Sequence, residues 1–163
     1  MGKTDAAQGN NSQMELESKI ESLANVDLPL YPQNPVSILV IDDDQLCFEC
    51  IETILYSFNY NIIHAKNGQE AVNIFQSNKD ISLIFMDLQM PVMDGFTATE
   101  EIRKINTEVP IICQTSYSIS GIKKKAINSG CTDFLLKLLI PEVLINKIEN
   151  YLKLTEKNQL ALS

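Results

Sequence analysis

From residue 36 onward, short apolar runs alternate with longer segments that are apolar on one face only. A strand covered on both faces of a parallel sheet is apolar along its whole length, so each run predicts a buried strand. The first run, VSILVIDDD, begins at Val36 and ends in three acids. This run is the first predicted strand, and the others are 61–65, 82–87, 109–115 and 132–137.

The segments between these runs have helical periodicity. Ala98, Ile102 and Ile105 repeat at the spacing of one helix face. Gly130 is typical of the residue that follows a helix, and Pro141 is typical of a first helical turn. The predicted helices are 45–58, a helix that starts near Gly68, 95–105, 119–128 and 141–152.

Five strands alternating with five helices predict a doubly wound α/β domain with a parallel sheet covered on both faces. We place this domain at 35–153 and a polar C-terminal tail at 154–163. Residues 1–34 are a polar linker whose prolines near its end favour an extended chain. Within it, Leu16, Ile20 and Leu23 predict a short helix at 14–24.

Composition narrows the function. The formal net charge is −8, which argues against a nucleic-acid surface and is compatible with a cation site or a basic partner. No apolar run approaches the ~18 residues that span a bilayer. The start of the chain lacks the apolar core of a signal peptide. We therefore expect a cytoplasmic protein without membrane contact.

The four cysteines are Cys47, Cys50, Cys113 and Cys131. Cys47 and Cys50 form a CxxC, and four thiols are enough for a zinc site. However, this CxxC lies inside an apolar helical pattern, and the other two cysteines do not form a second one. We interpret all four as small buried hydrophobic residues.

Reactive side chains gather where the predicted strands end. In a parallel sheet these carboxyl ends lie at one edge, where doubly wound folds bind ligands. The residues at this edge are Asp42, Asp43, Asp44, Asp87, Thr115, Ser116 and Lys137.

Carboxylates that share a site repel one another and need a counter-charge. Mg²⁺ supplies it with few protein ligands and leaves room for phosphate oxygens. A carboxylate is also a nucleophile that forms an aspartyl phosphate, while a lysine and a hydroxyl bind the transferred group. The pattern therefore predicts phosphoryl transfer.

Other phosphate chemistries fit less well. The chain has neither the glycine-rich phosphate loop of nucleotide triphosphatases nor a GxGxxG dinucleotide fingerprint. A phosphatase with an aspartate nucleophile favours a second acid two residues after it, and Gln89 stands there. An independent phosphatase or a flavin carrier is thus disfavoured.

The segments ILVIDDD, AKNGQEA, LIFMDLQMPVMDG, PIICQTS and GCTDFLLK occur in order. They resemble the receiver domain of two-component response regulators, most of all the receivers of hybrid sensor histidine kinases. The resemblance implies a flavodoxin-like (βα)5 fold with strand order 2-1-3-4-5. It also implies a signalling domain that is not itself an enzyme, either stand-alone or, as we favour, part of a hybrid histidine kinase.

The resemblance implies roles for single residues. Asp87 is the expected phosphoacceptor. Asp42 and Asp43 are the acidic pair, with Asp43, Asp87 and the backbone carbonyl of Gln89 touching Mg²⁺ and Asp42 acting through a metal-bound water. Lys137 is the expected lysine partner of the phosphoryl group. Pro91 and Gly95 match the loop that shapes the site.

The resemblance further implies a switch. Thr115 is the hydroxyl expected to move toward the phosphoryl group, and Phe134 is the switch aromatic. They signal to the surface formed by 119–128, 132–137 and 141–152. The expected donor is a histidine kinase or a histidine-phosphotransfer domain, and the expected state is a monomer or weak dimer. The alternative is a pseudo-receiver, an interaction module that keeps the fold without phosphate cycling.

One residue departs from the family pattern. The lysine is usually followed by proline with a cis peptide bond, and here Leu138 follows Lys137. A cis bond before a residue other than proline costs about 2.5–4 kcal/mol, so we expect a trans bond or a strained cis bond. Either weakens the aim of Lys137, which predicts slower phosphorylation than in a Lys-Pro relative.

Helix 45–58 is more apolar than one buried face requires. Cys47, Cys50, Ile51, Ile54 and Phe58 are predicted to face the core. On one flank of this face lie Phe48 and Leu55. They belong either to a wide core contact or to a docking patch for a helical histidine-phosphotransfer partner.

Other polar residues have a structural interpretation. Asp44 and Asp94 are predicted helix N-caps. Asp133 is predicted to lie in a loop or to start a strand, His64 to be structural or on the surface, and Lys123–Lys125 to be a solvated helix face. Beyond Thr115, Tyr117 either shields the phosphoryl group or covers its loop.

Overall fold

The structure is a computed structural model that describes residues 35–116 and 120–161. The helix expected at 14–24, the linker to residue 34 and both interpretations of Tyr117 lie outside the described residues. The proposed domain limits therefore stay predictions.

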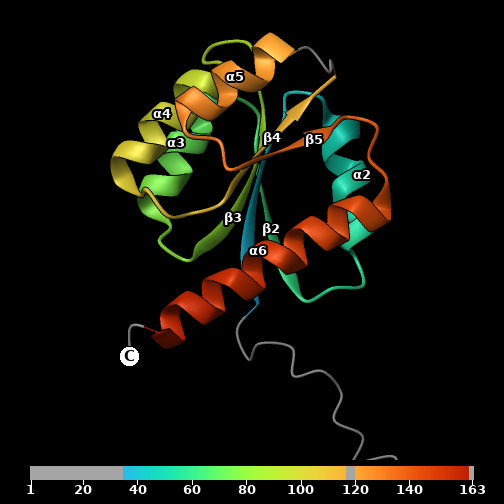
Figure 1. Cartoon of the computed structure of the whole chain (residues 1–163). Helices are drawn as coiled ribbons and strands as arrows, with labels where there is room; N and C mark the ends of the chain where they lie inside the picture. Colours follow the sequence, from blue (N-terminus) through green and yellow to red (C-terminus); the bar gives the residue numbers. More distant parts are fainter. Residues whose placement is uncertain (1–34, 117–119, 162–163) are drawn as a thin grey trace, which may run out of the picture. The chain divides into compact units, whose positions relative to one another are not determined.

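Five strands and five helices alternate along the described chain (Figure 1). Each predicted element is present, with most ends within two residues of their expected positions. The elements are β1 (Val36–Ile41), α2 (Gln45–Leu55), β2 (Tyr60–Ala65), α3 (Gly68–Ser77), β3 (Ile81–Asp87), α4 (Gly95–Ile105), β4 (Ile111–Thr115), α5 (Ser120–Ser129), β5 (Asp133–Leu136) and α6 (Pro141–Ala161).

The strands form one parallel sheet in the order β2-β1-β3-β4-β5. This confirms the predicted fold class and strand order. The central strands β1 and β3 are almost fully buried, as their continuous apolar sequences require. Because all five strands run the same way, their carboxyl ends share one edge of the sheet.

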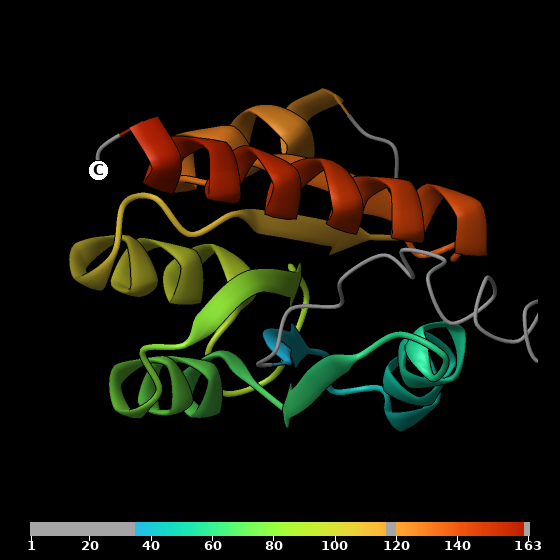
Figure 2. The ribbon, with the colours of Figure 1, turned by 90° about the horizontal axis from the view of Figure 1, so that it is seen from below.

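The sheet separates two hydrophobic cores. On one face, Phe75 of α3, Ile102 of α4 and Ala126 of α5 pack against the strands. On the other face, Ile51 of α2 and Ile148 of α6 do so. Figure 2 shows α3 and α4 on one side of the sheet and α2 on the other.

The buried face of α2 differs from the predicted one. Its buried residues are Phe48, Ile51 and Leu55, whereas Cys50 is exposed. Apolar residues occur on nearly every side of this helix, so its periodicity leaves the rotation about the helix axis ambiguous. The ring of Phe48 stacks on His64 of β2, with centroids 3.9 Å apart, and this contact accompanies the observed rotation.

Helix α6 continues to Ala161, beyond the predicted end at Leu152, so most of the segment predicted as a polar tail is helical. The sequence KLTEKNQLA that follows Leu152 contains neither Gly nor Pro. Its Lys, Leu, Glu and Gln residues have good helix propensity. No helix within residues 35–116 and 120–161 is long and apolar enough to cross a bilayer.

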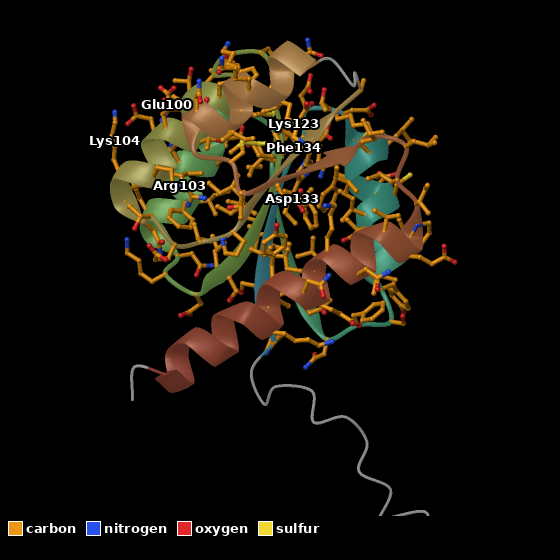
Figure 3. All side chains as sticks on the ribbon, viewed as in Figure 1. Glu100, Arg103, Lys104, Lys123, Asp133 and Phe134 are labelled. Carbon is orange, nitrogen blue, oxygen red and sulfur yellow. A yellow bond between two sulfur atoms is a disulfide. The ribbon has the colours of Figure 1, made fainter. Side chains whose placement is uncertain are left out.

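Arg103 of α4 fastens the connections at the amino ends of β4 and β5 (Figure 3). Its Nε donates to the carbonyl of Gly130 at 2.9 Å, and its NH1 donates to the carbonyl of Val109 at 2.8 Å. A further bond reaches Thr132 Oγ1 at 3.2 Å. Gly130 has a φ of 107° and follows the last residue of α5. The Arg103 guanidinium therefore binds the chain before β4 and the chain between α5 and β5.

We expect Arg103→Met to destabilise the domain by about 2–3 kcal/mol, because two part-buried carbonyl acceptors would lose a charged donor. Chemical denaturation measures this change. The matched control is Lys104→Met, whose ammonium makes an exposed i,i+3 pair with Glu101, and it should cost less than about 1 kcal/mol. Equal effects of the two substitutions would contradict a special role of Arg103.

Two cysteines are paired, which corrects their interpretation as four separate thiols. Cys113 of β4 and Cys131, which precedes β5, form a disulfide with a Cα–Cα distance of 6.2 Å. Both residues are buried, as predicted. Cys47 and Cys50 are free thiols, and their predicted burial is wrong, because Cys47 is half-buried and Cys50 is exposed.

Candidate functional site

Asp42, Asp87, Thr115 and Lys137 lie at or just beyond the carboxyl ends of β1, β3, β4 and β5. The backbone continues the sheet to this edge. Asp42 N donates to the carbonyl of Ala65 at 3.1 Å, and Lys137 N donates to the carbonyl of Thr115 at 3.0 Å. The sequence prediction that these residues gather at one edge is confirmed.

Three carboxylates form a cluster there. One oxygen each from Asp42, Asp43 and Asp87 lies within 4.8 Å of the others. Asp42 is fully buried and Asp87 is 3% exposed, whereas Asp43 is exposed. Asp42 and Asp87 thus form the buried side of the cluster, and Asp43 forms the exposed side, through which a ligand has access.

Lys137 provides the counter-charge. Its Nζ lies 2.6 Å from Asp87 Oδ2 and 3.0 Å from Asp42 Oδ2. No cis peptide bond occurs among the described residues, so the bond before Leu138 is trans. Lys137 nevertheless reaches both acids, so the distances show no loss of aim, and the slower phosphorylation stays a prediction.

Burial and charge shift the titration of two of these groups. Desolvation raises the pKa of Asp42 above its usual value, although bonds from the Asp44 amide and Lys137 oppose this. Burial disfavours the Lys137 ammonium too, but hydrogen bonds to Asp87 and Asp42 prevail and raise the pKa of Lys137 to about 12. Lys137 therefore stays charged at neutral pH.

The acid cluster fits a divalent cation. Lys137 bonds Asp42 Oδ1 at 3.2 Å, while the 3.0 Å approach to Oδ2 lacks hydrogen-bond geometry. Oδ2 of Asp42 is thus a buried carboxylate oxygen without a hydrogen-bond donor. The Lys137 charge lies 3.0 Å from this oxygen, but a metal-bound water would supply the hydrogen bond that it lacks, and an all-oxygen set suits Mg²⁺.

The loop after β3 is shaped around Asp87. A Cβ on Gly95 would lie 2.0 Å from the Asp87 carbonyl oxygen, so only glycine fits. Met93 N donates to the carbonyl of Pro91 at 2.9 Å, around Val92 with a φ of 71°. This is a strained γ-turn, of the kind found near functional sites. Gln89 N donates to Asp87 Oδ1 at 3.1 Å and fixes the carboxylate.

The structural interpretations of the remaining acids are confirmed. Asp44 Oδ1 accepts from Leu46 N at 2.9 Å and caps α2, and Asp94 Oδ1 accepts from Thr97 N at 2.8 Å and caps α4. Asp133 begins β5 and pairs with Lys147 of α6.

His64 has a structural role, as one of its two interpretations predicted, but its contact with the site was not predicted. Its Nε2 lies 3.0 Å from the carbonyl oxygen of Asp42, and its ring stacks on Phe48. The ring thereby braces the backbone of Asp42 just beyond the last register pair of β1 and β2. The available signal was the position of His64, one residue before β2 ends beside β1.

The two expected switch residues lie on neighbouring strands. Thr115 is buried at the end of β4. Phe134 of β5 is in register with Cys113, two residues before Thr115. The Lys123 ammonium lies 5.5 Å from the Phe134 ring centroid, and all of Lys123–Lys125 are exposed, as predicted (Figure 3).

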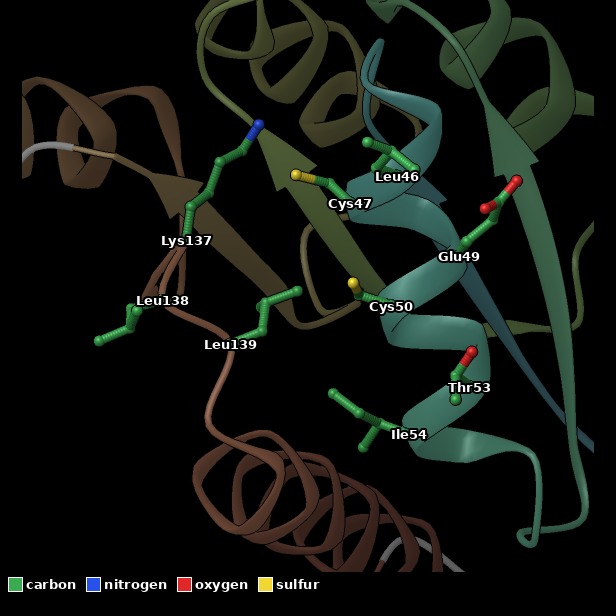
Figure 4. A pocket seen from close by; sticks show the side chains of 9 residues that line it. All are labelled: Leu46, Cys47, Glu49, Cys50, Thr53, Ile54, Lys137, Leu138 and Leu139. Atoms are coloured by element: carbon green, nitrogen blue, oxygen red, sulfur yellow. The ribbon is translucent and has the colours of Figure 1, made fainter.

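A groove of ≈ 590 Å³ lies between α2 and the connection from β5 to α6 (Figure 4). We call it the α2 groove. Its lining is mainly apolar, and Lys137 stands at one end. In the close view, Cys50 and Ile54 of α2 face Leu139, and Cys47 points toward Lys137. The lining residues are Leu46, Cys47, Glu49, Cys50, Thr53, Ile54, Lys137, Leu138 and Leu139.

Phe48 and Leu55, the two residues suggested for docking, do not line this groove. They are 8% and 2% exposed and belong to the core, so their wide-core interpretation holds and the patch prediction named the wrong residues. Leu46 is 70% exposed and Leu138 is 76% exposed. Burial, followed by the charge of Asp42, raises the pKa of the Cys47 thiol to about 11, which keeps this thiol uncharged at neutral pH.

Comparison with curated proteins gives hybrid signal transduction histidine kinases I and M of Dictyostelium discoideum. They are 29% and 36% identical over 93% and 69% of this chain. The chain spans only 9% and 5% of the length of these two relatives.

Two solved structures have similar folds. One is the receiver domain of the response regulator Ssk1 in complex with the histidine phosphotransfer protein Ypd1 of Saccharomyces cerevisiae. That match has 32% identity, a TM-score of 0.67 and covers 72% of this chain and 89% of the other. The second is the receiver domain of sensor histidine kinase PA1611 of Pseudomonas aeruginosa, with a magnesium ion in its active site cleft. It has 28% identity, a TM-score of 0.67 and covers 72% and 97%.

The fold, the acid cluster and these relatives agree with the family comparison. Residues 38–149 match the response regulator receiver domain, which covers most of the chain. The described strand order and the position of the acids at the sheet edge are those expected for this family. The chain belongs to the response regulator receiver domains.

Proposed function

We propose that the chain is a Mg²⁺-dependent phosphoacceptor in a His-to-Asp phosphorelay and that Asp87 accepts the phosphoryl group. One observation carries the proposal: Asp87 lies in the acid cluster with Lys137 Nζ 2.6 Å from its Oδ2. A nucleophilic carboxylate, a metal-binding acid set and a fixed cation are the parts that phosphoryl transfer needs.

In the proposed reaction, an Asp87 oxygen attacks the phosphorus of a phosphohistidine. The new P–O bond forms as the P–N bond breaks, and the electron pair stays on the imidazole nitrogen. Lys137 pairs with the oxygens of the transferred group, and the Gln89 amide holds the carboxylate in place. Asp43, Asp87 and the Gln89 carbonyl would hold Mg²⁺, with Asp42 acting through a metal-bound water. The ion supplies positive charge to the phosphoryl oxygens.

The conformational change caused by phosphorylation would pass through β4 and β5. We propose that the Thr115 hydroxyl moves toward the phosphoryl group and that Phe134 follows. Phe134 contacts one core and Lys123 lies over its ring, so a change in its position reaches the exposed side of α5. The surface of α5, β5 and α6 is therefore the proposed output.

The α2 groove is the proposed docking site of the donor, a helix of a histidine-phosphotransfer domain or histidine kinase. A phosphohistidine must come close to Asp87, and Lys137, which contacts Asp87, forms one end of the groove. Apolar helices bind in apolar grooves through side chains at helical spacing. The complex of the related Ssk1 receiver with Ypd1 supports a partner of this class.

Docking predicts a selective defect. With a phosphorylated histidine-phosphotransfer protein such as Ypd1, first shown to phosphorylate the wild-type chain, Leu46→Ala with Ile54→Ala should slow transfer about tenfold, as expected for a loss of about 1.4 kcal/mol. Acetyl phosphate is too small to need the groove, so its rate should not change. The control Ile127→Ala removes a 52%-exposed side chain of α5 and should leave both rates unchanged. Equal slowing with both donors would argue against docking.

Intact-protein mass spectrometry tests the function. We expect the gain of one phosphoryl group from acetyl phosphate with Mg²⁺ and none with excess chelator. A protein that takes no phosphoryl group from acetyl phosphate or from a phosphohistidine donor, with Mg²⁺ present, would instead be a pseudo-receiver. The contacts of Lys137 with both acids, made despite Leu138, support the phosphoacceptor over that alternative.

A further inference from the structure

The Cys113–Cys131 disulfide encloses the segment that contains the proposed switch. It joins residues 18 apart in sequence, and the enclosed chain includes Thr115 and α5. Cys113 lies two residues before Thr115 and in register with Phe134. The crosslink thus ties β4, close to its switch residue, to the chain that follows α5.

The fold around this pair is also held without the crosslink. Cys131 N donates to the carbonyl of Ala126 at 3.0 Å, and Thr132 N donates to that of Ile111 at 2.8 Å. Arg103 binds the carbonyl of Gly130 beside them. Reduced cysteines are small apolar side chains that suit this buried position. The fold is therefore compatible with both the disulfide and the two thiols.

We propose that Cys113 and Cys131 are a reversible thiol–disulfide site that adjusts the phosphorylation response of this receiver. Their Cα–Cα distance of 6.2 Å lies in the ordinary range for disulfides, so the bond forms without backbone movement. The crosslink restrains the segment that must move for the Thr115 hydroxyl to approach the phosphoryl group. The oxidised protein consequently favours the unphosphorylated state. The coupling rests on the proposed function, whereas the existence of the redox pair does not.

The oxidant is a small-molecule disulfide such as oxidised glutathione. Cys131 is 7% exposed and Cys113 is fully buried, so the Cys131 thiolate attacks first. The S–S bond of glutathione breaks, one glutathione leaves and a mixed disulfide forms on Cys131. The Cys113 thiolate then attacks Cys131 Sγ and displaces the second glutathione. The two protons lost by the protein thiols are taken up by the two released thiolates.

Linkage makes the coupling reciprocal. If oxidation weakens binding of a phosphoryl mimic by some factor, that mimic must favour reduction of the disulfide by the same factor. Beryllofluoride with Mg²⁺ is a suitable mimic because it binds a carboxylate as a phosphoryl group does. We expect a factor of about five, at the lower end of usual allosteric couplings.

The experiment compares the two redox forms of the whole chain. Alkylation after unfolding should modify four cysteines in the reduced protein and two in the oxidised one. Calorimetric titration with beryllofluoride and Mg²⁺ should then show about fivefold weaker binding to the oxidised form. The double variant Cys113→Ala, Cys131→Ala should bind beryllofluoride with the same affinity under oxidising and reducing conditions. If this variant does not fold, a glutathione titration of the wild-type protein with and without beryllofluoride measures the reciprocal shift.

Each outcome decides a separate point. Failure of oxidised glutathione to produce the two-thiol form would overturn the redox site. Equal affinity of both forms would overturn the coupling. If neither form binds beryllofluoride or accepts phosphate, the proposed function fails and the coupling fails with it, while the thiol count still reports whether the pair exists.

Discussion

Asp87→Asn should abolish phosphoryl uptake from both acetyl phosphate and a phosphohistidine donor. The amide has the shape of the carboxylate but lacks the negative oxygen that attacks phosphorus. The substitution also removes one member of the acid cluster and the 2.6 Å contact of Asp87 Oδ2 with Lys137. Intact mass measured after incubation with Mg²⁺ and either donor should therefore show only the unmodified protein.

The matched control is Asp44→Asn, which makes the same chemical change two residues after Asp42. Asn caps helices as well as Asp does, so α2 keeps its start. Because Asp44 is exposed, the phosphoryl uptake of the Asp44→Asn variant should stay within about twofold of that of the wild-type chain. If the Asp87→Asn variant still takes up a phosphoryl group and that group maps to Asp42 or Asp43, the acceptor is that residue and not Asp87.

The sequence was sufficient to predict the elements and the edge that carries the site. Buried parallel strands are continuous apolar runs, and the acids, Thr115 and Lys137 directly follow them, so strand position and chemistry are read together. Gly130 and Pro141 marked a helix end and a helix start. No comparable residue follows Leu152, and the end of α6 was therefore the least accurate boundary.

The rotation of α2 could not be predicted because residues 46–48, 50, 51, 54 and 55 are all apolar or cysteine. Tertiary contacts select the buried side, where Ile51 packs against the sheet and Phe48 stacks on His64. This observed rotation leaves Leu46 and Cys50 exposed, where they line one wall of the α2 groove. The hypothesis of a docking surface on this helix is kept, but on different residues.

The cysteine pair was missed for a related reason. A separation of 18 residues carries no distance information until β4 and β5 are known to be neighbours. Cys113 lies within one strand and Cys131 just before the other, so topology brings them together. The bond from His64 to the Asp42 carbonyl depends in the same way on the pairing of β1 with β2.

Lys137→Met should produce the largest loss of stability among the site variants. Asp42 and Asp87 are buried, and the substitution leaves both without their ammonium partner. Removing one partner of a buried ion pair costs about 3–5 kcal/mol. We expect the lower end of this range at neutral pH without Mg²⁺, because solvent reaches the site and screens its charges. The Lys137 side chain is 15% exposed, and Asp43 is exposed.

The pH dependence of this loss has a definite sign. Burial raises the pKa of Asp42 above its usual 3.8, so the folded state binds its proton more tightly than the unfolded state does. Ionisation of Asp42 consequently costs stability as pH rises above 3.8. Without Lys137, which lowers this pKa, the cost grows. The contribution of Lys137 in the wild-type protein is present below pH 10.5 and is lost as pH rises through about 12.

Denaturation of both proteins from about pH 4 to pH 7 tests this expectation: the deficit of Lys137→Met should be small at the acid end and widen toward neutrality. Saturating Mg²⁺ should narrow it, because a bound cation replaces the lost charge and stabilises the folded state by mass action. The control Lys124→Met removes an exposed lysine of α5 and should show neither effect. A deficit that is constant with pH and insensitive to Mg²⁺ would mean that Lys137 supports the fold through packing. In that case its role as the counter-charge of Asp42 and Asp87 would have to be abandoned.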